Sequence, residues 1–240
     1  MVHLSHVYKT FVADKHVLKN VQLQIGKGEF VFLMGPSGAG KTTLFRIITG
    51  FDQPTSGEIL VNNFKIGNMT APEMARFRRS IGVVFQDFKL LYDRSIFENV
   101  ALPLHVCGDH QWEVMEKVEK ILRRVGLGSR MNESPIHLSG GEKQRVAIAR
   151  ALVHEPDFVI ADEPTGNLDW RMSSEIMDLF KEANDRGTTL IIATHDKDII
   201  SQVKKPTIIK IENGQIFNSG EEAPCGSFFK PLQEAGLSIL

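Results

Sequence analysis

The sequence predicts an α/β fold in which buried parallel strands present a phosphate-binding site. Three apolar runs, at 30–34, 158–161 and 188–194, have the length and the β-branched or aromatic composition of buried strands. A glycine-rich stretch follows the first run, and polar side chains follow the other two. Because ligands of open α/β sheets bind at the carboxyl ends of the strands, these segments should meet at one crevice.

The glycine-rich stretch at 35–42 reads G-P-S-G-A-G-K-T and leads into a helical pattern at 42–48. Its glycines permit backbone conformations that side chains forbid, so successive N–H groups can converge on a phosphate at the helix N-terminus. Lys41 would then reach the β- and γ-phosphates, and the Thr42 hydroxyl would hold Mg²⁺. A glycine turn beside a surface lysine is the alternative, but the order of strand, loop and helix favours the phosphate site.

The other two strands end in residues suited to hydrolysis. Asp162 can meet the Mg²⁺ shell, and Glu163 can polarise an attacking water. Ordinary strand ends also carry acids, so this assignment depends on the other motifs. His195 follows the third run and should face the same crevice as Glu163, whereas the other seven histidines show no spacing typical of metal ligands.

A second anion-binding helix end is predicted at Ser139-Gly140-Gly141, which precedes a helical pattern at 142–152 and offers a serine cap. Two such helix ends and a single lysine-bearing loop make sense if two chains share each nucleotide. Arg145 and Arg150 on this helix are interpreted as solvated surface charges.

Length and composition fit one α/β domain with an inserted lobe, since 240 residues with 42% hydrophobic content can bury a sizeable core. A formal net charge of −1 argues against a broad nucleic-acid surface, so no nucleic-acid partner is expected. Cys107 and Cys225 are far apart, which favours reduced thiols in a cytosolic setting. The first 11 residues are too polar for a signal peptide, and no apolar run approaches the ~18 residues of a membrane span.

Turn-forming residues between the apolar runs predict how the chain is organised. Alternating runs at 2–34 and 57–85 predict an antiparallel flank, and 88–150 should form the helical lobe, with one helix at 111–125. Asn213-Gly214 separates two strand-like runs and predicts a hairpin. We therefore expect one domain at 1–220 and a tail at 221–240. Four apolar residues of the tail could dock on the core or on a partner: Phe228, Phe229, Leu232 and Leu237.

Five segments together resemble the motif set of ABC nucleotide-binding domains, over about residues 1–217. They are 35–42, V-F-Q-D at 84–87, L-S-G-G-E-K-Q-R at 138–145, D-E-P-T-G-N-L-D at 162–169 and A-T-H-D at 193–196. The resemblance implies a P-loop NTPase core of the ABC-ATPase type: a RecA-like sheet with an antiparallel β flank and an inserted α-helical subdomain. It also implies an ATPase that works as a head-to-tail pair around two ATP and drives a membrane partner.

The resemblance assigns roles to individual residues. Gln86 would sense the γ-phosphate and Mg²⁺ and link them to the membrane partner. Ser139 and Gly141 would bind the γ-phosphate held by the opposite subunit. Asp169 would communicate across the dimer, and His195 would contact the γ-phosphate and order the catalytic site.

Phe11 falls where the family places an aromatic residue that stacks on adenine, and Tyr8 is the second candidate. The implied catalytic residues are Glu163, His195, Gln86 and Lys41. The implied Mg²⁺ ligands are Thr42, Gln86 and Asp162. The implied ATP-binding residues are Phe11, Gly35, Pro36, Ser37, Gly38, Ala39, Gly40, Lys41, Thr42, Thr43, Gln86, Ser139, Gly140, Gly141 and Asp169.

Within the family, G-N-L-D at 166–169 resembles the group of lipoprotein-release, macrolide-efflux and FtsE ATPases rather than amino-acid importers. The stretch 85–104 is most similar to FtsE, although Phe88 and the extended tail depart from its pattern. This resemblance implies the membrane protein FtsX as partner, a peripheral position on the cytoplasmic face of the inner membrane, and control of septal cell-wall hydrolysis.

Other functions remain open. A lipoprotein-release or macrolide-type exporter is the alternative within the family. A soluble ABC protein acting on ribosomes or DNA would show tandem cassettes or long heptads, which are absent, and a non-hydrolysing scaffold would have lost Glu163 or His195. The stretch 88–92 is predicted to wall the groove that receives a helix of the partner, with simple packing in the lobe as the alternative.

Overall fold

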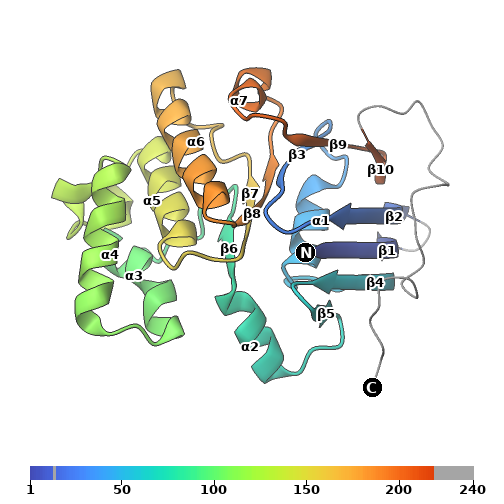
Figure 1. Ribbon diagram of the computed structural model, residues 1–240, viewed down its shortest axis with the longest axis horizontal. Coiled ribbons are helices and arrows are strands. Elements are labelled where there is room, and N and C mark those ends of the chain that lie inside the picture. The colour runs from blue at the N-terminus through green and yellow to red at the C-terminus, as the bar shows by residue number, and fades with distance from the viewer. Residues whose placement is uncertain (13–14, 219–240) are drawn as a thin grey trace.

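A six-stranded sheet with the order β10-β9-β3-β8-β7-β6 forms the centre of this computed structural model, which describes residues 1–12 and 15–218 (Figure 1). The strands are β3 Phe30–Met34, β6 Ile81–Val84, β7 Phe158–Asp162, β8 Thr189–Ala193, β9 Thr207–Glu212 and β10 Gln215–Asn218. All neighbours are parallel except β9 and β10. The three predicted buried strands and the predicted hairpin are confirmed.

A second sheet, with the order β2-β1-β4-β5, is antiparallel throughout and forms the predicted flank. Its strands are β1 Val2–Val12, β2 Lys15–Ile25, β4 Ser56–Val61 and β5 Phe64–Ile66. Buried and more exposed residues alternate over much of β1, as expected for a sheet with one face on the core.

Helices cover the two faces of the central sheet unequally. Helix α1, Lys41–Ile48, and helix α2, Ala71–Arg79, pack with the antiparallel sheet against one face. The opposite face carries α3 Ile96–Cys107, α4 Gln111–Arg124, α5 Gly140–Leu152, α6 Trp170–Asp185 and the short α7 Lys197–Ser201. In β3, Val31 and Leu33 face the first group, whereas Phe30 and Phe32 face the second. Helices α1 and α5 therefore lie on opposite faces of the sheet (Figure 1).

The helical lobe consists of α3, α4, α5 and the short 3₁₀ turns η1, Gly128–Arg130, and η2, Pro135–His137. Capping boxes start α3 and α5, where Ser95 pairs with Glu98 and Ser139 pairs with Glu142. The expected helix at 111–125 is found one residue shorter, and α5 begins two residues before the expected start at 142 because the serine cap recruits both glycines. The division into a domain at 1–220 and a tail stays a prediction.

Among the described residues, none of the helices has the length and apolar character of a membrane span. Cys107 is a free, exposed thiol. Predictions about Cys225, the 221–240 tail and its four apolar residues fall outside the described part of the chain.

The interpretation of Arg150 as a solvated charge is wrong. Its guanidinium donates to the carbonyl oxygens of Phe88 and Lys89, both at 2.7 Å, and burial lowers its pKa. Phe88 and Lys89 have φ of 61° and 49°, a conformation that side chains disfavour. Arg150 thus ties the end of α5 to a strained turn that lies directly after Gln86.

Replacing Arg150 with methionine keeps much of the side-chain volume but leaves the two carbonyl groups without their charged donor. We expect Arg150→Met to lower the free energy of unfolding by about 2 kcal/mol, the scale of hydrogen bonds to a charged group. Urea denaturation measures this. Arg123→Ala is the control, because Arg123 only pairs with Glu119 on the surface of α4 and should cost less than about 0.5 kcal/mol. Equal losses in the two variants would contradict the bracing role of Arg150.

Candidate nucleotide-binding and catalytic site

The phosphate loop joins β3 to α1 and has the backbone that its glycines predict. Gly38 and Gly40 have φ of 77° and 107°, in the left-handed region. A side chain at Gly35 would place its Cβ 2.2 Å from the carbonyl oxygen of Ile211, so only glycine fits between the loop and β9. Gly40 is the N-cap residue of α1, which directs the unpaired N–H groups of the helix start into the loop.

Lys41 and Thr42 begin α1 and point in different directions. The Lys41 ammonium donates to the carbonyl oxygens of Gly35 at 2.7 Å and Pro36 at 3.1 Å, so it folds back over the loop. The Thr42 hydroxyl donates to Oδ2 of Asp162 at 2.7 Å. The other predicted loop residues, Ser37, Ala39 and Thr43, lie in the same loop and the first turn of α1.

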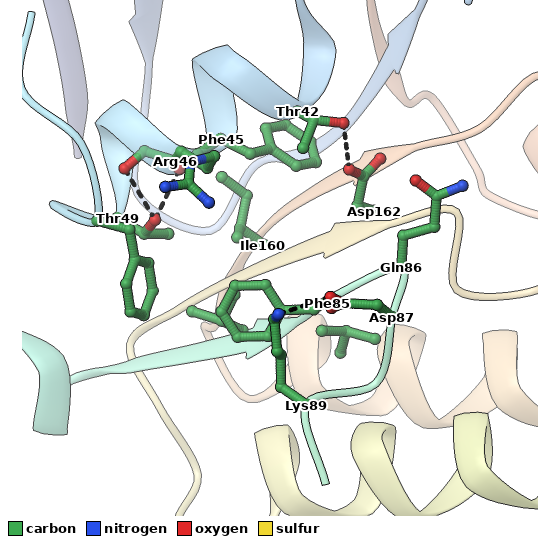
Figure 2. A pocket seen from close by; sticks show the side chains of 13 residues that line it. Thr42, Phe45, Arg46, Thr49, Phe85, Gln86, Asp87, Lys89, Ile160 and Asp162 are labelled. Carbon is green, nitrogen blue, oxygen red and sulfur yellow. Dashed lines mark hydrogen bonds and ion pairs between the residues drawn. The ribbon is translucent and has the colours of Figure 1, made fainter.

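Asp162 at the end of β7 is 6% exposed, and burial raises the pKa of its carboxyl group while the bond from Thr42 opposes this. A cavity of about 720 Å³ opens beside the pair and is also lined by Gln86. Figure 2 shows the Gln86 side chain extending toward the carboxylate of Asp162. The structure thus brings the three predicted metal ligands to one place.

These three residues offer a hydroxyl, a carboxylate and an amide oxygen. Mg²⁺ prefers such hard oxygen donors and normally takes its remaining ligands from water and substrate phosphates. The donor set therefore fits Mg²⁺ bound together with a nucleotide. No cluster of three or more His, Cys, Asp or Glu side chains that could hold a metal by itself occurs in residues 1–12 and 15–218.

Glu163 and His195 meet at the same edge of the sheet. Nδ1 of His195 lies 3.7 Å from Oε1 of Glu163, and the two side chains are 78% and 30% exposed, respectively. The backbone N–H of Glu163 donates to Ala193 at 3.0 Å, which fixes the end of β7 against the end of β8. Glu163 has φ of 48°, an unusual value for a non-glycine residue and one that recurs at functional sites.

The second predicted anion site lies at the start of α5, away from the phosphate loop. The Ser139 hydroxyl accepts from the N–H of Glu142 at 3.3 Å and donates to Oε2 of Glu142 at 2.9 Å. A side chain at Gly141 would bring its Cβ 3.0 Å from the carbonyl oxygen of Asn167, so the start of α5 packs closely on the 166–169 loop. Asp169, at the end of that loop, caps α6 by accepting from the N–H of Met172 at 2.9 Å.

The two aromatic candidates for adenine binding differ in their availability. Phe11 is 58% exposed, and the ammonium of Lys9 lies 4.8 Å from its ring centroid. The Tyr8 ring already packs edge-on against His16, with centroids 5.7 Å apart. His16 precedes Val17, whose carbonyl oxygen would lie 3.2 Å from a Cβ at Gly40. This end of the β1–β2 hairpin therefore adjoins the phosphate loop. Because its ring is exposed there, Phe11 is a better candidate than Tyr8 for stacking on adenine.

The sequence did not reveal the residues that contact and position the predicted site residues. Arg130 binds both Glu133 and Glu142, and Lys9 lies beneath Phe11. Only the Ser139–Glu142 spacing carried a readable signal, as a capping box. The bond from Arg130 to Glu142 joins residues 12 apart and depends on the fold, so no local pattern indicated it.

Comparison with known proteins agrees with the motif resemblance. The family model described as ABC transporter matches residues 18–166. The cell division ATP-binding protein FtsE of Bacillus subtilis (strain 168) is 44% identical over 228 residues, which are 95% of this chain and 100% of that protein. The methionine import ATP-binding protein MetN 1 of Bacillus cereus is 41% identical over 92% of this chain and 64% of that protein.

The solved structures agree as well. The dimeric structure of the bacterial ABC transporter cassette MJ0796 superposes with a TM-score of 0.84 and 39% identity, covering 90% of this chain and 96% of that chain. Its dimeric post-hydrolysis state, bound to ADP and Pi, gives a TM-score of 0.83, with 38% identity and the same coverage. The predicted fold class is confirmed.

Asp162→Asn tests whether the buried carboxylate is kept for binding rather than for folding. Asparagine can still accept from Thr42 but carries no charge to bury, so we expect it to raise the free energy of unfolding of the nucleotide-free chain by about 1 kcal/mol. The same variant should lose at least ~10²-fold in Mg²⁺-dependent ATP hydrolysis. Asp157→Asn, an exposed change at the other end of β7, should alter neither quantity appreciably. Full activity in Asp162→Asn would remove Asp162 from the metal site.

Proposed function

This chain belongs to the ABC transporter family of ATP-binding proteins, and on that premise we propose that two copies enclose two ATP molecules and drive a membrane partner that controls cell division. The chain is an ATP-hydrolysing cassette of this family. The observation that carries the proposal is the division of anion-binding elements between the two faces of the sheet. The phosphate loop lies on α1, whereas Ser139 lies on α5 beyond the opposite face.

Each chain contributes a nearly complete half-site. Lys41 and the amides of the loop would hold the β- and γ-phosphates, with Thr42, Asp162 and Gln86 as oxygen ligands of Mg²⁺. When bound, Mg²⁺ would neutralise negative charge on the phosphate oxygens. Glu163 would take a proton from the attacking water, and His195, 3.7 Å from its carboxylate, would contact the γ-phosphate and orient it.

The partner chain would complete each site. Its Ser139 hydroxyl and the free amides at the start of α5 would approach the γ-phosphate, since a capped helix N-terminus favours an anion. Gly141 packs on the 166–169 loop, so a displacement of α5 would move Asp169. The same loop would transmit this movement to Glu163. The dimeric state of MJ0796 supports this arrangement.

A second cavity, of about 410 Å³, supports a site for the membrane partner. It is lined by α2, β6, α3 and α5, and its wall includes Leu102 and Val106, which are 42% and 54% exposed. Arg78 and Arg79 stand at the same cavity. We infer that it receives a cytoplasmic helix of the partner that carries apolar and acidic side chains.

The two cavities share part of their lining, which gives the partner a path to the nucleotide. Phe51 and Val83 line both cavities. The Phe51 ring packs edge-on against Phe85, with centroids 5.3 Å apart, and Phe85 precedes Gln86. A helix seated against Phe51 would thus act on Gln86 through one ring contact.

The groove wall predicted at 88–92 is partly represented at these cavities, since Lys89 lines the cavity of Gln86. Leu90 is 6% exposed and packs in the core, and Phe88 is partly buried against the same cluster. Leu91 and Tyr92 are 40% and 45% exposed, so a groove wall formed by this stretch stays a prediction. The alternative left open by the sequence, packing in the lobe, describes Phe88 and Leu90.

The relatives support a proposal for the identity of the partner. The match spans the whole length of Bacillus FtsE but only 64% of the methionine importer, so the division ATPase is the better template. On this template the partner is FtsX, the chain sits peripherally on the cytoplasmic face of the plasma membrane, and the output is regulated septal cell-wall hydrolysis. A lipoprotein-release or macrolide-type exporter remains the second candidate because it would use the same half-sites.

Glu163→Gln should make the ATP-bound dimer accumulate. Without a base for water, turnover should fall by about 10²- to 10⁴-fold, while ATP binding persists. Sedimentation should then show monomers without nucleotide and dimers with ATP and Mg²⁺. Adding Ser139→Arg should abolish the dimer, and Lys41→Ala should instead lose nucleotide affinity. Wild-type turnover in Glu163→Gln, or sedimentation that ignores ATP, would count against the proposal.

Val106→Glu tests the partner cavity. A carboxylate forced among apolar side chains is costly, so the variant should leave the membrane fraction of cells that contain the partner, while keeping its fold and its activity in solution. Trp112→Glu is the matched control, because Trp112 is an exposed residue of α4, 65% exposed, that does not line this cavity. Equal membrane retention of both variants would exclude the cavity as the docking site.

The phenotype of Val106→Glu separates the two candidate functions. A division ATPase predicts filaments or chains of cells with normal lipoprotein sorting and drug tolerance. Normal division with mislocalised lipoproteins would promote the exporter instead.

A further inference from the structure

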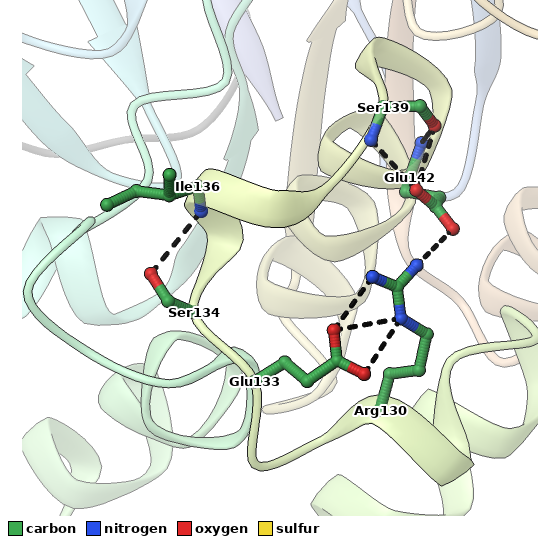
Figure 3. A network of polar contacts seen from close by, with 6 residues as sticks. All are labelled: Arg130, Glu133, Ser134, Ile136, Ser139 and Glu142. Atoms are coloured by element: carbon green, nitrogen blue, oxygen red, sulfur yellow. Dashed lines mark hydrogen bonds and ion pairs between the residues drawn. The ribbon is translucent and has the colours of Figure 1, made fainter.

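Arg130, the last residue of η1, links three acidic or polar groups that are separate in the sequence (Figure 3). Its Nη2 donates to Oε2 of Glu133 at 2.7 Å, and its Nε lies 3.0 and 3.1 Å from the two oxygens of the same carboxylate. Its Nη1 donates to Oε1 of Glu142 at 2.6 Å. The planar guanidinium therefore holds two carboxylates in a fixed relative position.

The far oxygen of Glu142 continues the network to Ser139. Oε2 of Glu142 accepts from the backbone N–H of Ser139 at 2.8 Å and from its hydroxyl at 2.9 Å. Hydrogen bonding from the Ser139 backbone lowers the pKa of the Glu142 carboxyl group, which is therefore ionised at neutral pH. Glu142 thus uses one oxygen to hold Ser139 and the other to bind Arg130.

An ionised Glu142 creates a conflict at this helix end. The N-terminus of α5 is suited to an anion, but a carboxylate in its first turn would repel an incoming γ-phosphate. The same carboxylate also holds the hydroxyl hydrogen of Ser139, which a phosphate oxygen would need to accept. The positive charge of Arg130 offsets part of this repulsion. Arg130 also fixes the position of the carboxylate that accepts the Ser139 hydroxyl hydrogen.

We propose that Arg130 is a positioning residue for the ATP of the opposite chain: it anchors Glu142 and offsets part of its negative charge, so that Ser139 and the start of α5 can receive a γ-phosphate. This rests on the shared site of the proposed function. Arg130 touches no nucleotide in this account, and it acts through Glu142. The Arg130 and Glu142 side chains are 31% and 23% exposed, so their ion pair is partly solvated and should matter little for folding.

The experiment compares variants in the Glu163→Gln background, where ATP-driven dimers should persist. Arg130→Ala should raise the ATP concentration for half-maximal dimerisation, measured by sedimentation, by roughly fivefold or more, the scale of losing one charge-assisted contact. Arg130→Lys keeps the charge but not the fork, so it should recover part of the loss. Arg123→Ala, which removes an exposed pair on α4, should match the Glu163→Gln parent.

Two further measurements separate positioning from folding. Thermal unfolding midpoints of the Arg130 variants should match that of the parent. Binding of a fluorescent ATP analogue by dilute, monomeric chains should also be unchanged, because each chain keeps its own phosphate loop. A merely structural role would instead lower the unfolding midpoint or the monomer affinity together with dimerisation.

Each result has one meaning. If the parent fails to dimerise with ATP, the proposed function fails and the role of Arg130 with it. If the parent dimerises and Arg130→Ala behaves like Arg123→Ala, the shared site stands and the positioning role is overturned. If Arg130→Ala weakens monomer binding or folding to the same degree, Arg130 acts within its own chain and the proposal is also wrong.

Discussion

The hydrogen bond between the Thr42 hydroxyl and the Asp162 carboxylate is the contact on which the catalytic edge of this protein depends. It fixes the start of α1 to the end of β7, with β8 between β3 and β7 in the sheet. Backbone bonds complete the alignment, since Thr194 donates to Leu33 at 3.3 Å and Glu163 donates to Ala193 at 3.0 Å. The phosphate loop, the predicted metal ligands, Glu163 and His195 therefore share one rigid frame.

The same sheet keeps the second anion site at a distance. Alternate residues of each strand face opposite layers, so α1 packs on one face and α5 on the other. Within one chain, Ser139 and the phosphate loop therefore lie on opposite sides of the sheet, and in the proposed dimer a second copy supplies Ser139. Arg150 braces the turn after Gln86 from the end of α5, and the Arg130 network holds the start of α5. One helix thereby connects Ser139, the turn after Gln86 and the cavity proposed for the membrane partner.

Much of the fold and the positions of the site residues could be predicted because the sequence patterns that indicate them are local. The strand before Gly35, the glycine loop and the acids after β7 each occupy a few consecutive residues whose physics can be read directly. The bonds from Arg130 to Glu142 and from Arg150 to the turn after Gln86 could not be predicted, because these partners lie 12 and about 60 residues away and are chosen by the fold. The groove wall at 88–92 stays a prediction for the same reason, since periodicity alone does not say which apolar side chain meets the core and which meets a partner. Family resemblance supplied roles for Gln86 and His195 that no local rule would have given.

Hydrogen exchange in the Glu163→Gln variant tests the shared site most directly, because it reports on both anion sites separately. With ATP and Mg²⁺, amides at 35–43 should be protected at every protein concentration, since each chain binds nucleotide by its own loop. Amides at 139–142 should become protected only when the protein is concentrated enough to pair. Amides at 139–142 that stay unprotected at all concentrations, or are protected equally in dilute monomers, would contradict a site divided between two chains.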